Sequence, residues 1–352
     1  MSDHIKYMQR CLELAEKGLG STAPNPMVGA VIVCNGKIIG EGYHKQYGQP
    51  HAEVNAIESV SDKSLLTESA MYVSLEPCCH FGKTPPCTSL IIDMKIPEII
   101  IAMRDPNPKV AGKGIEILKN SGVKITEDIC TMEAEFLNRR FISMHKRQRP
   151  WIILKWAQSD DGFIDIIPRN TSPHINWISN PYSRKLVHKW RSEESGILVG
   201  KNTAINDNPS LTTREWPGKN PVRFLIDPGL ATPFNYNIFN TDAHTVCFYD
   251  QKTILPDDRP EYIQFVPLNF NTNIAKQIMK HVYDMQINSI IIEGGRYTID
   301  SFIHSNLWDE ARVITGHVCF KKGISAPVLP VLPSEKINIE KDIIHTYYNT
   351  TT

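Results

Sequence analysis

Two successive runs of alternating strand-like and helix-like segments are the feature that most limits how this chain can fold. In the first run, apolar stretches such as AMYVSLE and PEIIIAM alternate with amphipathic stretches such as GKGIEILKNSG. A charged break, HKRQRP, ends at Pro150, and the alternation then starts again. Strands that alternate with helices are typical of a layered α/β domain with a covered sheet. We therefore predict two α/β domains, residues 1–147 and 148–352.

Local signals place several elements within these domains. An Asn35-Gly36 turn between two apolar runs predicts a β-hairpin. The stretch TMEAEFLNRRFISMHKR, residues 131–147, predicts one long helix. SNPYSRKLVHKWRSE predicts a helix that Ser179 caps, with Pro181 in its first turn. SGILVGKNT predicts a strand followed by a turn.

Composition and charge exclude some classes of partner. The chain has 38 basic and 38 acidic side chains, so its formal net charge is zero, which argues against a nucleic-acid substrate. The segment MSDHIKYMQRCLELAEKG lacks the basic and apolar regions of a signal peptide. No apolar run reaches the ~18 residues that a membrane span needs. We expect a cytoplasmic protein with no membrane partner, in which thiols stay reduced.

The cysteines divide into isolated residues and one cluster. The isolated ones lie in apolar or helical settings and are predicted to be buried structural thiols: Cys11, Cys34, Cys130, Cys247 and Cys319. The cluster lies in EPCCHFGKTPPC, residues 76–87, where Cys78 and Cys79 are adjacent and Cys87 follows.

Together with HAEVNAIE, residues 51–58, this cluster indicates a catalytic metal site. His51 and two thiolates would give Zn²⁺ three protein ligands, with a fourth position left for water. Glu53 lies two residues from His51, where it can take a proton from that water and pass it to a leaving amine. The residues alone do not decide which of Cys78 and Cys79 joins Cys87. If both did, the site would close and become structural.

The combination His51-Ala52-Glu53 with Pro77-Cys78 resembles the zinc nucleobase deaminases, whose signature is H-x-E…P-C-x-x-C. Phe81 replaces the second thiol of that signature, and the next thiol is Cys87. This spacing, with GKTPPC inside it and APNPMVGAVIV upstream, resembles the bifunctional riboflavin-biosynthesis deaminase/reductases. The resemblance implies a cytidine-deaminase-like αβα sandwich, with His51, Cys78 and Cys87 as zinc ligands and Cys79 as a bystander.

The same resemblance implies contacts to a pyrimidine substrate. Asn25 lies between two prolines, and a lysine in the cysteine loop suits a phosphate or carbonyl oxygen. The implied substrate residues of this domain are Asn25, His44, His80 and Lys83.

The second half has no G-x-G-x-x-G fingerprint, but IIIEGGRY offers a Gly-Gly turn between a strand and a helix. With LKWAQSDDGFI and VGKNTAINDNPSLTTR, it resembles the dihydrofolate-reductase-like α/β domain of the same family. The implied cofactor residues are Ala157, Trp177, Thr203, Asp207, Gly295, Arg296, Tyr297 and Thr298. The implied ribosyl phosphate residues are Lys155, Arg191, Leu211, Arg214 and Glu293. Asp160 and the stretch 165–176 depart from the family pattern.

The resemblance implies two reactions on small-molecule pyrimidine ribosyl phosphates. One Zn²⁺ per chain would support hydrolytic removal of an amine from a diaminopyrimidinone ribosylamino phosphate. NADPH would then reduce the ribosyl side chain to ribityl, giving 5-amino-6-ribitylaminouracil 5′-phosphate. A homo-oligomer, dimer or tetramer, is also implied. The alternatives are a nucleic-acid deaminase with the same zinc site, and a non-enzymatic zinc module in which Cys79 is a fourth ligand.

Overall fold

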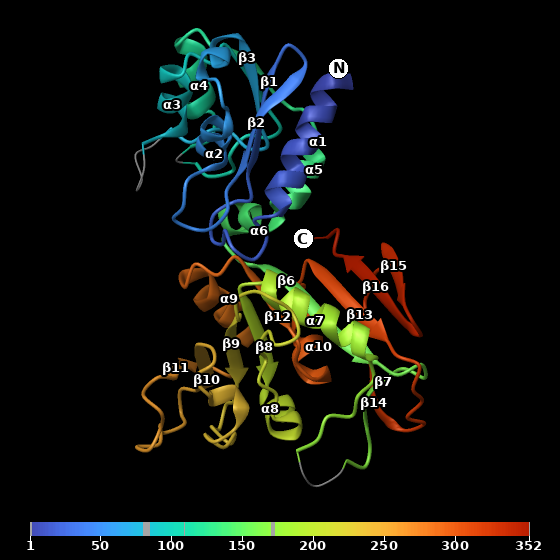
Figure 1. Cartoon of the computed structure of the whole chain (residues 1–352). Coiled ribbons are helices and arrows are strands. Elements are labelled where there is room, and N and C mark those ends of the chain that lie inside the picture. Colours follow the sequence, from blue (N-terminus) through green and yellow to red (C-terminus); the bar gives the residue numbers. More distant parts are fainter. Residues whose placement is uncertain (1, 80–84, 109, 170–172, 352) are drawn as a thin grey trace. The chain divides into compact units, whose positions relative to one another are not determined.

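The computed structural model describes residues 2–79, 85–108, 110–169 and 173–351. They form two compact units, Met1–Gln148 and Arg149–Thr352 (Figure 1). Each unit has its own sheet and its own hydrophobic core. None of the helices formed by the described residues has the length and apolar character that a bilayer crossing demands.

The first unit is built around a five-stranded sheet in the order β2-β1-β3-β4-β5. β1 pairs antiparallel with β2 and β3, while β3, β4 and β5 are parallel. Its strands are β1 (Gly29–Cys34), β2 (Lys37–Tyr43), β3 (Ser69–Val73), β4 (Glu98–Ile101) and β5 (Lys124–Thr126). Every residue of β1 is buried, because helices cover both faces of the sheet.

Helices form the outer layers of this αβα sandwich. Its helices are α1 (Ser2–Glu16), α2 (Ala52–Ser59), α3 (Cys87–Asp93), α4 (Lys113–Asn120), α5 (Thr131–Leu137) and α6 (Arg139–Ile142). A 3-10 helix, Lys63–Glu68, and a π-helical turn, Ser143–Arg147, complete the unit. α1 and α5 lie on one face of the sheet and α2, α3 and α4 on the other (Figure 1).

The single helix predicted over 131–147 is wrong, because the helix is interrupted at Asn138 between α5 and α6. The Asn138 side chain accepts a hydrogen bond from the Met27 N–H (2.8 Å) and donates one to the Met27 carbonyl (2.9 Å). Both partners lie 111 residues earlier in the chain. A tertiary contact therefore overrides the local helical pattern at this residue.

The second unit is built around a nine-stranded sheet in the order β11-β10-β9-β8-β12-β6-β13-β16-β15. The strands from β11 to β13 are parallel, and β16 and β15 add antiparallel pairs at one edge. They are β6 (Trp151–Gln158), β8 (Gly196–Gly200), β9 (Val222–Ile226), β10 (Thr245–Asp250), β11 (Gln264–Leu268), β12 (Ser289–Ile292), β13 (Glu310–Thr315), β15 (Glu335–Ile339) and β16 (Asp342–Tyr348). β7 (Phe163–Ile166) and β14 (Gly323–Ser325) form a separate two-stranded sheet.

Helices cover both faces of the large sheet as well. They are α7 (Pro181–Glu193), α8 (Lys201–Asp207), α9 (Ile274–Asp284) and α10 (Arg296–His304), with a 3-10 turn at Asn237–Phe239. The side chains of β6 alternate between the faces: Ile152, Leu154 and Trp156 join the core under α9 and α10. Ile153 joins the core beside α8 on the opposite face. Since side chains alternate along a strand, Lys155 belongs to this second face.

Three local predictions change in this unit, and one of them is the burial of Cys319, whose side chain is exposed. Ser179 is not the cap of α7; Asn180 is, because its side chain accepts a hydrogen bond from the Ser183 N–H, while Pro181 opens the helix as expected. The turn expected after β8 is the helix α8. Asp160 is exposed in a tight turn, so its departure from the family pattern buries no charge.

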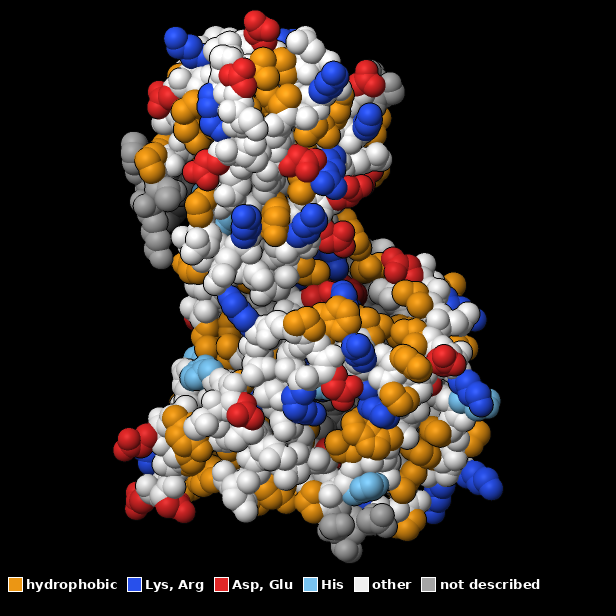
Figure 2. All heavy atoms as spheres, viewed as in Figure 1, with side chains coloured by type: hydrophobic (Ala, Val, Ile, Leu, Met, Phe, Trp, Pro, Cys, Tyr) orange, Lys and Arg blue, Asp and Glu red, His pale blue; other side chains and the backbone are white. Residues whose placement is uncertain are grey.

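Charged side chains are interspersed on the surface. On the face shown in Figure 2, blue and red side chains lie among one another over each unit, without a broad field of one sign. On this face the distribution fits the zero net charge of the chain (Figure 2).

Candidate active sites

The first unit brings the three expected metal ligands together. His51 is the residue before α2, Cys87 is the first residue of α3, and Cys78 follows the end of β3. Their ligand atoms all lie within 4.8 Å of one another. The His51 Nδ1 atom lies 3.5 Å from the Cys78 Sγ and 3.4 Å from the Cys87 Sγ.

This geometry fits a tetrahedral zinc ion. Zn–N bonds of about 2.05 Å and Zn–S bonds of about 2.3 Å, at a tetrahedral angle, place nitrogen and sulfur about 3.6 Å apart. The Cys87 N–H also donates to the Cys78 Sγ (3.3 Å), which favours a thiolate there. The Cys87 thiol and the His51 imidazole, as hydrogen-bond partners, hold the pKa of Cys78 far below its usual value. Cys79 does not belong to this group of ligand atoms.

Glu53 lies in the first turn of α2, two residues after the His51 ligand. Its side chain is buried, and that burial, with the nearby Cys78 thiolate, raises the pKa of Glu53 to about 7. A carboxyl group in this setting can both accept and release a proton near neutral pH.

Asn25 and His44 lie next to one another beside the metal ligands. The Asn25 Nδ2 atom lies 3.3 Å from the His44 Nε2, and the His44 Nδ1 lies 3.1 Å from the Pro50 carbonyl oxygen. Burial lowers the pKa of His44, so its ring is neutral and donates to Pro50 through Nδ1. The ring also meets the His51 ring edge-on at 5.4 Å. This arrangement brings two expected substrate residues to the metal group.

Sequence reasoning missed Asn138, which is buried and holds the loop that carries Asn25 through its two bonds to Met27. No local signal marks it, because an asparagine within a helical pattern is ordinary. His80 and Lys83, the other two expected substrate residues, lie outside the described residues.

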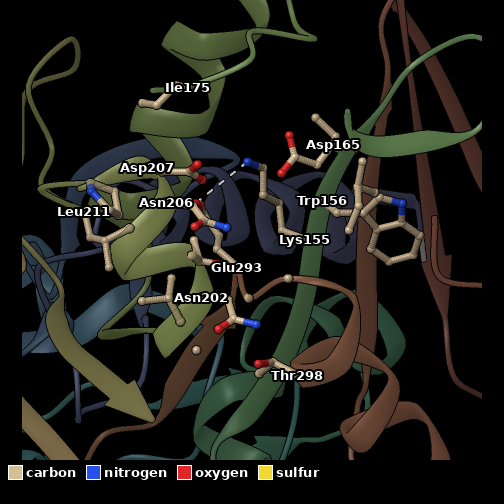
Figure 3. Close-up of a pocket in the computed structure, with 18 of the residues that line it drawn as sticks. Lys155, Trp156, Asp165, Ile175, Asn202, Asn206, Asp207, Leu211, Glu293 and Thr298 are labelled. Carbon is tan, nitrogen blue, oxygen red and sulfur yellow. Dashed lines mark ion pairs between the residues drawn. The ribbon is translucent and has the colours of Figure 1, made fainter. Parts of the chain in front are cut away.

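The second unit contains a cavity of about 990 Å³. Every residue that the resemblance assigned to the reductase site lines it. Those residues are Lys155, Ala157, Trp177, Arg191, Thr203, Asp207, Leu211, Arg214, Glu293, Gly295, Arg296, Tyr297 and Thr298. They come from β6, α7, α8, α10 and the loops between them, so segments far apart in sequence meet around one space (Figure 3).

A buried charge cluster lies at the carboxyl end of β12. Glu293 is 2.8 Å from Arg191 and 3.8 Å from Lys155, and Figure 3 shows Lys155 and Glu293 projecting toward one another. Burial opposes ionisation of Glu293, but the Arg191 and Lys155 charges prevail and lower its pKa to about 2. Among the described residues, the Glu293 Oε1 and the Arg191 Nε find no hydrogen-bond partner. The buried cluster therefore keeps one unsatisfied acceptor and one unsatisfied donor.

Arg214 lies near this cluster and is held from two sides. Its backbone N–H donates to the His188 Nδ1 (3.1 Å), and its guanidinium donates to the Thr212 Oγ1 (3.0 Å). Its guanidinium is partly buried and lines the cavity, where it can bind a phosphate group through two parallel hydrogen bonds.

The Gly294-Gly295 turn forms a cradle at the start of α10. A Cβ atom at Gly294 would lie 2.5 Å from the Thr298 Cβ, and one at Gly200 would lie 2.6 Å from the Thr298 Oγ1. Gly295 precedes the first turn of α10, whose free N–H groups suit a phosphate. The two close approaches show that Thr298 packs directly against Gly200 and Gly294, which fixes the start of α10 beside the cavity. The residues at this helix start therefore fit a phosphate group.

Arg169 is a second feature that sequence reasoning missed. It lines the cavity and donates to Asp165 and to Asp207, at 2.5 Å each. Asp207 is thus tied to Arg169 by an ion pair across 38 residues. No motif connects the two residues, and only the tertiary fold places them together.

Each of the two units matches a known protein family. Residues 1–103 match the family described as the cytidine and deoxycytidylate deaminase zinc-binding region, and residues 150–319 match the RibD C-terminal domain. The chain is 39% identical over 323 residues to the riboflavin biosynthesis protein RibD of Aquifex aeolicus, covering 91% of this chain and 88% of that protein. It is 34% identical to the Escherichia coli RibD, covering 86% and 85%.

Solved structures give the same result. A deaminase/reductase from Thermotoga maritima, described as a diaminohydroxyphosphoribosylaminopyrimidine deaminase/5-amino-6-(5-phosphoribosylamino)uracil reductase, superposes with a TM-score of 0.86 at 33% identity and 98% coverage of both chains. Acinetobacter baumannii RibD superposes with a TM-score of 0.88 at 28% identity and 99% coverage of both chains.

Fold and sites together define a bifunctional enzyme that joins a zinc-type deaminase domain to a reductase domain. The chain belongs to the RibD family of riboflavin-biosynthesis proteins. The prediction of a deaminase/reductase made from the sequence is confirmed, as are the mixed α/β folds of its two parts.

Proposed function

We propose that the chain deaminates 2,5-diamino-6-ribosylamino-4(3H)-pyrimidinone 5′-phosphate and then reduces the ribosyl side chain of the product with NADPH. The observation that carries this proposal is the presence on one chain of the His51, Cys78 and Cys87 group with Glu53 and of the cavity around Glu293. The deaminase/reductase description of the Thermotoga maritima relative supports the choice of substrate.

In deamination, water adds to the ring carbon that carries the amine, the C–N bond breaks, and ammonia leaves. When bound, zinc supplies Lewis acidity that lowers the pKa of water toward 7. Glu53 accepts a proton from the attacking water and returns one to the leaving amine. Its burial supports this role, because the carboxyl is shielded from bulk solvent and interacts electrostatically with Cys78 and His51.

Asn25 and His44 orient the pyrimidine. Since the Asn25 Nδ2 is directed at His44, its amide oxygen is the acceptor left for a ring N–H. Neutral His44 keeps this amide in one orientation through its bond to Pro50. His51, Cys78 and Cys87 would hold zinc, and Cys79 would take no part.

In reduction, the residues of the second unit bind and align the reactants. When bound, NADPH supplies the hydride. The Gly294-Gly295 turn and Thr298 receive its phosphate groups, while Arg191 and Arg214 bind the substrate phosphate. Lys155 and Glu293 offer a donor and an acceptor to the ribosyl hydroxyl groups.

Purified full-length protein of determined metal content tests this proposal. The diaminopyrimidinone ribosylamino phosphate should release ammonia before NADPH is oxidised, and Glu53→Gln should abolish ammonia release with zinc retained. Zinc without ammonia release from this substrate would refute the proposal and direct attention to nucleosides and tRNA. A higher kcat/KM for NADPH than for NADH checks the choice of cofactor.

We also propose a homo-oligomer, dimer or tetramer, in the cytoplasm. The family resemblance supports the oligomer. The reduced thiolates of Cys78 and Cys87 that the zinc site needs support a reducing compartment. Light scattering of the purified chain measures its mass directly.

A further inference from the structure

Glu76 lies between β3 and the metal ligand Cys78, and its buried carboxylate accepts four backbone hydrogen bonds. Its Oε2 atom accepts from the N–H groups of Asp105 (3.2 Å) and Gly112 (2.9 Å). Its Oε1 atom accepts from those of Gly114 (3.0 Å) and Ile115 (3.3 Å). The Glu76 side chain thus connects the segment before Cys78 to the loop after β4 and to the first turn of α4.

The charge of Glu76 suits this position. Gly114 and Ile115 belong to the first turn of α4, whose N-terminal N–H groups have no partner within the helix. A carboxylate at a helix N-terminus also interacts favourably with the helix dipole. All four partners are donors, and an ionised carboxylate is a side chain that only accepts.

The backbone of Pro77 packs closely against the first turn of α4. A Cβ atom at Gly114 would lie 2.2 Å from the Pro77 carbonyl oxygen, so only glycine allows α4 to approach this peptide. On the other side of the metal ligand, the Cys78 carbonyl accepts the Thr88 N–H (3.2 Å). Cys78 is therefore held between α4, through Glu76 and Pro77, and α3.

We propose that Glu76 is a positioning residue that fixes the Cys78 sulfur where zinc binds. It touches neither the metal nor the substrate, and it acts through the backbone of Pro77 and Cys78. This inference rests on the zinc site of the proposed function. Glutamine at this position would turn an N–H₂ group toward backbone donors, which forces the segment to move.

Zinc binding by the full-length chain tests the inference. Glu76→Gln should bind Zn²⁺ about 10- to 100-fold more weakly in competition with a chelator, the range found when groups that support metal ligands are changed. Gly114→Ala should weaken zinc binding as well, because it displaces Pro77 without changing any charge. This second variant decides the question if Glu76→Gln does not fold.

Glu41→Gln is the matched control. Glu41 is another carboxylate of the same unit, and it accepts two hydrogen bonds from Arg10, at 2.7 and 2.9 Å. Loss of the Glu41 charge should weaken the ion pair with Arg10 and lower the stability of the unit without changing its zinc affinity. NADPH oxidation with deaminated substrate, a reaction of the other unit, should be unchanged in all three variants.

Equal zinc affinity in wild type, Glu76→Gln and Gly114→Ala would overturn the inference. So would an equal loss of affinity in Glu41→Gln, because zinc binding would then follow general stability. A wild-type chain that binds no stoichiometric zinc would instead refute the metal site of the proposed function, so the two failures are distinguishable.

Discussion

The Arg191 guanidinium lies 2.8 Å from the Glu293 carboxylate, and both side chains are nearly buried in the cavity of the second unit. Lys155 is the second cation beside Glu293, and His188 adds a weaker interaction. A single carboxylate therefore balances two buried cations. Its ionisation is coupled to the stability of this unit as well as to ligand binding.

Glu293 should make the stability of the second unit depend on acid pH. Its pKa is about 2 in the folded chain against an ordinary 4.5, so the stabilisation is fully present above pH 4.5 and is lost as pH falls toward 2. The shift corresponds to roughly 3 kcal/mol. Glu293→Gln should be less stable than wild type at pH 5, and the difference should shrink by roughly half at pH 3.

Urea unfolding followed by tryptophan fluorescence measures this difference, because all six tryptophans lie in residues 149–352. Asp284→Asn is the control, since Asp284 forms an exposed ion pair with Lys280. A difference between wild type and Glu293→Gln that stays constant from pH 5 to pH 3 would contradict the coupling.

Cys79 should be dispensable for metal binding. Its thiol lies outside the group formed by His51, Cys78 and Cys87. Cys79→Ser should keep about one zinc per chain after dialysis, while Cys78→Ser and Cys87→Ser should lose it, because removal of one of three protein ligands greatly weakens the site. Metal content measured by emission spectroscopy checks this. Loss of zinc in Cys79→Ser would instead indicate a closed four-ligand site.

The metal group and the reductase cavity could be predicted from sequence because short motifs carry them. His51-Ala52-Glu53 and Pro77-Cys78 lie at the junctions of local elements that the alternation also predicts. The strand that ends before Glu293 and the glycine turn that follows it are also adjacent in the sequence, so a short motif covers both. In these segments the periodicity and the chemistry agree, but the choice of Cys78 over Cys79 and the assignment of the cavity residues came from the family resemblance.

What the sequence did not reveal depends on contacts between distant residues. Asn138 interrupts a helical pattern because its side chain bonds to Met27. Arg169 reaches Asp207, and Glu76 reaches the N–H groups of α4. Each of these side chains, considered locally, is an ordinary polar residue. Only the folded chain shows the backbone groups or charges that each one satisfies.

Asn138 should influence substrate binding without influencing zinc. Asn138→Ala removes two buried hydrogen bonds and leaves the Met27 peptide unsatisfied, which should cost about 2 kcal/mol of stability. Because Met27 lies two residues from Asn25, the KM for deamination should rise several-fold while zinc content stays the same. Steady-state ammonia release measures the KM. Ser121→Ala, at an exposed helix end, is the control and should change neither quantity.

Gly294 should be required for cofactor affinity. In Gly294→Ala the new Cβ would lie 2.5 Å from the Thr298 Cβ, so the start of α10 must shift and its N–H groups move away from the cofactor phosphate. We expect the Kd for NADPH to rise at least ~10-fold, equivalent to the ~1.4 kcal/mol of one charge-assisted hydrogen bond. Gly229→Ala is the matched control, because a Cβ there meets no atom within 4 Å. Fluorescence titration with NADPH measures both affinities. Equal affinity in the two variants would show that the cofactor phosphate does not bind at this turn.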